Sequence, residues 1–168
     1  MTTAPVQTIL VALELSAHDE PLLQTAKAYA RAFGAPLVLV HVVAPEPDFV
    51  GLPKHGEAAT PRAPDEPEVG YAYDRARKAQ RARKEHAEIE RLRAEIEASG
   101  LRANALLVEG AYADKIVQEA KRLGAGLIML GSHQRSTVGE WLLGSTSRDV
   151  LRQAPCPVLV VPRALAAA

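Results

Sequence analysis

The sequence predicts an α/β fold, an open, doubly wound parallel sheet with helices on both faces. Four short apolar runs, rich in β-branched residues, place hydrophobic side chains on consecutive positions: TILVAL (residues 8–13), PLVLVHVV (36–43), GLIMLG (126–131) and PVLVV (157–161). Strands that are covered on both faces of a parallel sheet have this pattern, because neither face meets water. Segments with helical periodicity separate the runs, so strands and helices alternate along the chain.

The helical segments are identified by their apolar stripes. Two stripes stop at a glycine, the usual C-terminal cap, at Gly34 and Gly124. The first stripe consists of Leu22, Leu23, Ala26, Ala30 and Phe33, and the second of Ile116, Val117, Ala120 and Leu123. A long charged helix over residues 71–100 carries a stripe of Ala79, Ala82, Ile89, Leu92 and Ile96, and residues 148–154 form a short last helix. RANALLVEG, residues 102–110, is a weaker fifth strand.

The composition of the 168-residue chain limits its class and its partners. A chain of this length forms one domain, over residues 1–168, that buries roughly 70% of its unfolded surface. Twenty basic and twenty acidic side chains balance, so no net field attracts nucleic acid or a membrane. The lone Cys156 excludes an internal disulfide, no apolar run reaches the roughly 18 residues of a membrane span, and the N-terminal stretch is too short and too acidic for a secretory signal. We therefore expect a soluble cytoplasmic protein.

One connection lacks both the helix period and the strand period. Residues 44–70 contain six prolines and three glycines, which predicts a long loop. Loops beyond about 15 residues are uncommon in compact domains and serve as lids, binding segments or disordered insertions. Disorder is the simplest interpretation of this loop, and we also expect the alanine-rich tail, residues 164–168, to be frayed.

The long helix has an unusual distribution of charge. Basic residues crowd its N-terminal half and acidic residues its C-terminal half, opposite to what the helix dipole favours. No aromatic residue is interleaved with the basic ones, so a nucleic-acid surface is disfavoured. We interpret the helix as a solvated face that balances its own charge.

The residues between the fourth strand and the last helix are rich in glycine and serine. In an open parallel sheet the ligand crevice lies beyond the carboxyl ends of the strands, where Gly131 is expected. If the first and fourth strands are neighbours, residues 14–16 and 131–135 face the same crevice. Gly144 precedes a helix whose N-terminal N–H groups suit phosphate, and both glycines would let the backbone come close to it.

A purely structural alternative explains the same residues. Gly131 would end a strand, Gly144 would allow a turn, and Ser145 would be an ordinary N-cap. Neither G-x-G-x-x-G after the first strand nor G-x-x-x-x-G-K-S/T occurs in the chain. Spacing alone therefore favours the structural alternative.

Four segments together resemble the universal stress protein family: ILVALELS, LVLVHVV, GSHQRSTVGEWLLGSTS and VLRQAPCPVLVVP. The resemblance spans nearly the whole chain. It implies an α/β domain with strand order 3-2-1-4-5, a dimer, and ATP bound between the first and fourth strands. It also makes the last strand, Val158–Val161, the expected dimer edge, which pairing with a second copy would cover.

The resemblance assigns the nucleotide contacts to the ends of three strands and to the last helix. They are Ala12, Leu13, Glu14 and Ser16, then Val42, then Leu130, Gly131, Ser132, His133, Gln134 and Arg135, and then Gly144, Ser145, Thr146 and Ser147. Val42 would bind adenine through its backbone and Leu130 would border the base, while the serine-rich segments surround ribose and phosphates.

Two positions depart from the family's nucleotide motif. Gln134 replaces its second glycine, and Glu14-Leu15-Ser16 replaces aspartate-glycine-serine. Glu14 would repel phosphates unless a divalent cation such as magnesium bridges them.

Other reactive residue types do not form a recognisable centre. No pair of the five histidines has metal-ligand spacing, so we expect no metal site in the protein itself. Ser132 and His133 lack the G-x-S-x-G elbow of a hydrolase, and Cys156 between two prolines is expected to be buried and inert.

Three functions fit these observations. The first is a regulatory ATP-binding stress-response protein with little or no turnover and no catalytic residue. The second is a nucleotide-independent dimeric interaction module, with its pocket altered by Gln134 and Glu14. The third and weakest is a slow ATPase or nucleotide-transfer enzyme that uses Glu14 and a metal.

Overall fold

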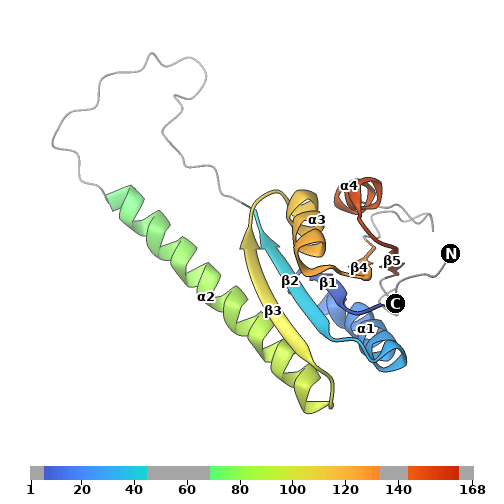
Figure 1. Cartoon of the computed structure of the whole chain (residues 1–168). Coiled ribbons are helices and arrows are strands. Elements are labelled where there is room, and N and C mark those ends of the chain that lie inside the picture. Colours follow the sequence, from blue (N-terminus) through green and yellow to red (C-terminus); the bar gives the residue numbers. More distant parts are fainter. Residues whose placement is uncertain (1–5, 45–68, 133–143, 163–168) are drawn as a thin grey trace, which may run out of the picture.

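The computed structural model describes residues 6–44, 69–132 and 144–162, with side chains described from residue 76 onward in the long helix. Five parallel strands form one sheet in the order β3-β2-β1-β4-β5 (Figure 1). Their bounds are β1 Ile9–Leu13, β2 Leu37–Val43, β3 Ala103–Glu109, β4 Leu127–Gly131 and β5 Val158–Val161. The predicted doubly wound fold and its strand order are confirmed, and the weak candidate at 102–110 is a full strand.

Four α-helices cover the two faces of the sheet (Figure 1). They are α1 Glu20–Phe33, α2 Val69–Ala98, α3 Tyr112–Leu123 and α4 Ser145–Gln153, and a short 3-10 turn, Ala17–Asp19, precedes α1. One buried cluster joins α1 and α2 to Ile9, Val11 and Leu13 of β1, and the other joins α3 and α4 to Leu10. The two faces therefore receive alternate side chains of the same strand.

Helix α2 departs from the prediction at its N-terminal half. It begins at Val69, so residues 69 and 70 are helical, and residues 45–68 of the predicted loop lie outside the described residues, as does the tail 164–168. Ile89, Leu92 and Ile96 are buried as predicted, but Ala79 and Ala82 are exposed. A 30-residue helix is about 45 Å long, whereas the seven residues of β3 span about 23 Å, so half of α2 extends beyond the strand that covers it.

The first helix also differs in one residue. Leu22, Leu23, Ala26 and Ala30 are buried, but Phe33 is 50% exposed because it occupies the last turn and packs its ring against Tyr29 instead. Gly34 and Gly124 end α1 and α3 in left-handed conformations, φ 63° and 60°, as predicted. In the part of the chain that the structure describes, none of the helices has the length and hydropathy of a membrane span.

Candidate functional site

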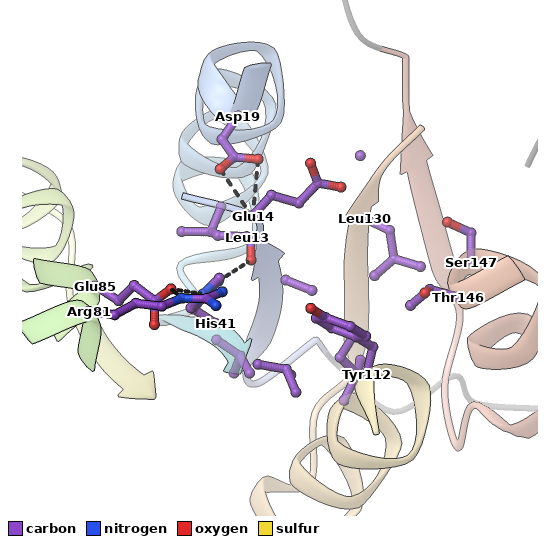
Figure 2. Close-up of a pocket in the computed structure, with 15 residues that line it drawn as sticks. Leu13, Glu14, Asp19, His41, Arg81, Glu85, Tyr112, Leu130, Thr146 and Ser147 are labelled. Carbon is purple, nitrogen blue, oxygen red and sulfur yellow. Dashed lines mark hydrogen bonds and ion pairs between the residues drawn. The ribbon is translucent and has the colours of Figure 1, made fainter. Parts of the chain in front are cut away.

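A cavity of about 400 Å³ lies at the carboxyl ends of β1, β2 and β4 (Figure 2). The N-terminal turns of α3 and α4 and the middle of α2 close it on the other sides. Eight of the predicted contact residues line it: Ala12, Leu13 and Glu14 after β1, Val42 in β2, Leu130 and Gly131 in β4, and Thr146 and Ser147 in α4. The segments that sequence reasoning placed around one crevice thus meet in one cavity.

Of the other predicted contacts, the four that the structure describes, Ser16, Ser132, Gly144 and Ser145, are not among the lining residues. Ser16 caps the 3-10 turn, and Ser132 is buried, with its N–H donated to the carbonyl of Val161 and its hydroxyl without a hydrogen-bond partner. Ser145 is the first residue of α4 and not its N-cap, which is Gly144. Gly144 has φ −61°, so its backbone conformation does not require glycine. His133, Gln134 and Arg135 lie outside the described residues.

Sequence reasoning missed seven residues that line the cavity: Asp19, Val40, His41, Arg81, Glu85, Tyr112 and Ile116. Val40 and His41 precede the predicted Val42 and could have been found from the carboxyl end of the same strand. Arg81 and Glu85 carried no local signal, because their approach depends on how α2 crosses the sheet.

A buried carboxylate holds the loop after β1. Asp19 is 4% exposed and accepts hydrogen bonds from the backbone N–H of Glu14 (3.1 Å) and of Ser16 (3.0 Å). The Ser16 hydroxyl in turn accepts from the N–H of His18, which completes a capping box. Charge-assisted bonds of this kind compensate for burying the carboxylate. The amides of residues 14 and 16 are therefore already used by the protein.

This loop contains an unusual backbone conformation. Leu15 has φ +56°, the left-handed region that branched and bulky residues avoid, and no other non-glycine residue among those described has positive φ. Leu15 stands where the family motif has glycine. Its side chain packs against the α1/α2 core, which with the Asp19 hydrogen bonds offsets the backbone strain.

A polar wall joins α2 to the end of β2. His41 Nδ1 lies 2.9 Å from the carbonyl oxygen of Leu13, which can only accept, so Nδ1 carries the proton. His41 Nε2 lies 3.8 Å from Glu85 Oε1, and the same oxygen accepts a hydrogen bond from Arg81 Nε at 2.8 Å. Glu85 Oε2 is buried without a hydrogen-bond partner. This wall provides charged and polar atoms opposite the apolar side of the cavity (Figure 2).

The opposite side of the cavity is apolar. Val40, Val42, Ile116 and Leu130 are buried residues of the α3/α4 core that also line the cavity. Tyr112, the first residue of α3, is 46% exposed and extends its ring along this side (Figure 2). A flat heteroaromatic group would bury its faces here and meet polar atoms at its edges.

The charged end of the cavity combines a carboxylate with a helix N-terminus. Glu14 is exposed beside the cavity, and the N-cap residue of α4, Gly144, has no side chain with which to cap the first N–H groups of the helix. The helix N-terminus favours an anion, whereas Glu14 disfavours one. Among the described residues no three histidine, cysteine or acidic side chains gather to hold a metal, so a divalent cation here would take oxygens from a ligand and from water.

Cys156 is half-buried and lies outside the cavity lining. Burial raises the pKa of its thiol, and a hydrogen bond from the backbone of Ile128 opposes this only partly. A raised pKa makes a thiol a poorer nucleophile at neutral pH, whereas the full burial that the sequence predicted for Cys156 is not observed.

Comparison with known proteins identifies relatives over most of the chain. A family model described as the universal stress protein family matches residues 5–162. A Thermus aquaticus protein, the universal stress protein in the QAH/OAS sulfhydrylase 3' region, is 37% identical over 156 residues, which is 92% of this chain and 98% of that protein. Universal stress protein MJ0577 of Methanocaldococcus jannaschii is 35% identical over 75 residues, 45% of this chain and 46% of that protein.

Solved structures share the fold. The structure of MJ0577 superposes with a TM-score of 0.71 at 23% identity and covers 97% of this chain and 100% of its own. A universal stress protein in complex with cAMP has a TM-score of 0.61 at 21% identity, covering 96% of this chain and 100% of its own. The universal stress protein from Archaeoglobus fulgidus in complex with dAMP has a TM-score of 0.58 at 20% identity, covering 94% and 99%.

Replacement of Asp19 tests the carboxylate that holds the loop. Asp19→Asn keeps the shape but removes the charge that two backbone N–H groups bind, so we expect a loss of about 1–3 kcal/mol in the free energy of unfolding. The measurement is urea denaturation followed by circular dichroism. Asp114→Asn, at an exposed site in the first turn of α3, is the matched control and should change stability by less than about 0.5 kcal/mol. Equal losses in the two variants would contradict this role of Asp19.

The backbone of Leu15 can be tested by comparing alanine with glycine. At a left-handed position glycine carries no strain, so Leu15→Gly should be more stable than Leu15→Ala by about 1 kcal/mol. Leu101 packs half-buried on the same core without positive φ, and there the alanine variant should be the more stable one. Denaturation midpoints of the four variants measure both differences, and alanine above glycine at residue 15 would contradict the assigned conformation.

Proposed function

The chain belongs to the universal stress protein family, and from that premise we propose that it is a regulatory stress-response protein that binds ATP in the cavity between β1 and β4. The observation that carries this proposal is the joining of an apolar wall to the N-terminus of α4 within one cavity of about 400 Å³. Pockets that enclose small-molecule ligands have volumes of about 300–1,000 Å³.

The two halves of the cavity match the two halves of a nucleotide. The adenine ring would lie between Val42 and Leu130, with the ring of Tyr112 against it. The phosphates would extend toward Thr146, Ser147 and the uncapped N–H groups of α4. Two fold neighbours were solved with the adenine nucleotides cAMP and dAMP, which supports an adenine nucleotide as the class of ligand.

A magnesium ion would reconcile Glu14 with the phosphates. Mg²⁺ is usually held by one or two carboxylates together with phosphate oxygens and water. Glu14 would supply the carboxylate here. In this proposal ATP is a ligand rather than a substrate, and the protein works in the cytoplasm as a homodimer paired through β5.

One observation favours a second candidate, a dimeric interaction module that does not bind nucleotide. Asp19 already occupies the amides of residues 14 and 16, so this loop offers no free N–H at those two positions to a phosphate. Phosphate binding would then depend on the α4 side alone. If the α4 side alone does not bind the phosphates, the protein has the fold of the family but binds no nucleotide in this cavity.

Replacement of Gly144 separates the two candidates. Asp and Asn are equally good N-caps and nearly equal in size, so Gly144→Asp and Gly144→Asn differ mainly in charge. We expect ATP with magnesium to bind at least about tenfold more weakly to the aspartate variant, because its carboxylate would face the phosphates. Isothermal titration calorimetry measures both affinities alongside the unmodified protein.

Each result of this titration decides between the candidates. ATP binding that weakens only in the aspartate variant supports a phosphate group at the N-terminus of α4. ATP binding by the unmodified protein that is lost in both variants supports a close approach of ATP to the backbone of Gly144, which a Cβ atom blocks. No heat from the unmodified protein would leave the interaction module as the function, and equal affinity in all three proteins would overturn phosphate binding at the N-terminus of α4.

A further inference from the structure

The N-terminal half of α2 projects away from the sheet and has no cover among the described residues. From residue 76 onward, where the side chains of α2 are described, the buried ones are Ile89, Leu92 and Ile96, all in its C-terminal half. Figure 1 shows the helix diverging from β3 toward its N-terminal end, with its outer side open. Among the described side chains of this helix, those of Arg81 and Glu85 line the cavity. Most of the surface of α2 therefore has no role in the site described above.

Four charged residues on one face of this helix form a pattern that reads the same, with signs reversed, from either end, and Arg81 and Arg91 flank these four residues on the two sides. Arg77, Lys84, Glu88 and Glu95 follow one another at spacings of seven, four and seven residues, which keeps all four on one face of an α-helix. Two cations are followed by two carboxylates at mirror-image spacing. A rotation by 180° about an axis perpendicular to the helix, at the level of residue 86, exchanges the position of Arg77 with that of Glu95 and the position of Lys84 with that of Glu88.

The charges on this face are not balanced within one chain. Glu88 and Glu95 both pair with the single guanidinium of Arg91, and all three side chains are between 42% and 55% exposed. The hydrogen bonds to Arg91 lower the pKa of Glu88, so its carboxylate is charged at neutral pH. Arg77 and Lys84 are exposed and make no ion pair with any residue that the structure describes. Two carboxylates thus share one cation while two cations lie unpaired on the same face.

We propose that α2 pairs with the α2 of a second copy of this chain, antiparallel, about a two-fold axis beside residue 86. Arg77 of each copy then meets Glu95 of the partner subunit, and Lys84 meets Glu88 of the partner subunit. A two-fold interface is self-complementary, so one register forms all four ion pairs.

Other occupants fit this face less well. A nucleic acid would meet the basic half but would be repelled by Glu88 and Glu95 on the same face. A parallel pair of helices would place like charges opposite each other. The antiparallel pair satisfies both halves of the face at once, and its charge complementarity sets the register.

The association should be weak and sensitive to salt. Exposed ion pairs each strengthen an association by only about 1.5- to 5-fold, so four of them together strengthen it by about 5-fold to a few hundredfold. At 1 M salt the Debye length is about 3 Å, against about 10 Å at 0.1 M, which screens them. Pairing of β5 strands would rest on backbone hydrogen bonds and apolar contacts, so the α2 interface would join chains or dimers in a second, salt-dependent step.

Two charge-reversal variants test the interface. Arg77→Glu/Lys84→Glu makes the face wholly acidic, and Glu88→Lys/Glu95→Lys makes it wholly basic. We expect the unmodified chain to show a self-association step by sedimentation velocity at about 0.1 M salt that is lost at about 1 M, and each variant alone to lose that step at low salt. An equimolar mixture of the two variants should regain it, because opposite faces then meet.

Circular dichroism and thermal melting of each variant establish that it is folded, and nucleotide titration is a separate measurement on the same proteins. Failure of the mixture to regain the step, a step unchanged by 1 M salt, or no such step in the unmodified chain would overturn the proposal. Gain of a step only when DNA is added would assign the basic half to nucleic acid instead. None of these results depends on whether the cavity binds ATP.

Discussion

The pairing of β1 with both β2 and β4 determines where the rest of the site lies. In this register Leu13 is opposite His41, and Ala12 is opposite Leu130. Strands β1 and β4 therefore end at one level and β2 two residues beyond it, and the helices that follow β1 and β4 lie on opposite faces of the sheet. The cavity lies at these strand ends, as expected at the reversal of strand order in a doubly wound sheet. Because this register places Leu13 opposite His41, the carbonyl oxygen of Leu13 lies within hydrogen-bond distance of His41 Nδ1 and fixes the tautomer of the imidazole.

The loop after β1 has a left-handed backbone conformation at Leu15, a residue that is not glycine. Glycine is the residue that adopts positive φ without strain, yet Leu15 holds φ +56° here. The carboxylate of Asp19 binds the amides on either side of it, so the loop is fixed by hydrogen bonds rather than by the preference of one residue. The position of Glu14 at the cavity consequently does not depend on a glycine. A bulky residue can therefore hold a left-handed conformation where hydrogen bonds from its neighbours impose it.

The sequence predicted the features that depend on local pattern. Buried parallel strands read as continuous apolar runs, and the two glycines with φ near +60° end helices as their position suggested. Prediction from the sequence failed for features that depend on the length of a helix relative to the strands it covers, or on contacts between segments far apart in the chain. Ala79 and Ala82 share the period of Ile89, but no strand extends far enough to cover them. His41 and Glu85 are 44 positions apart and meet only because α2 crosses the end of β2.

Helix α2 connects the cavity with the outer surface of the molecule. Arg81 and Glu85 line the cavity, and Lys84 and Glu88 lie within one turn of them on an exposed face. A ligand beside Glu85 changes the surroundings of the carboxylate that Arg81 and His41 share. Such a contact affects the pairing of α2 only if the ligand binds the paired and unpaired forms of the protein with different affinities. Pairing then changes the affinity for the ligand by the same factor by which the ligand changes pairing. Helix α2 has its C-terminal half packed on β3. Any coupling between ligand binding in the cavity and pairing of the helices would have to be transmitted through this helix.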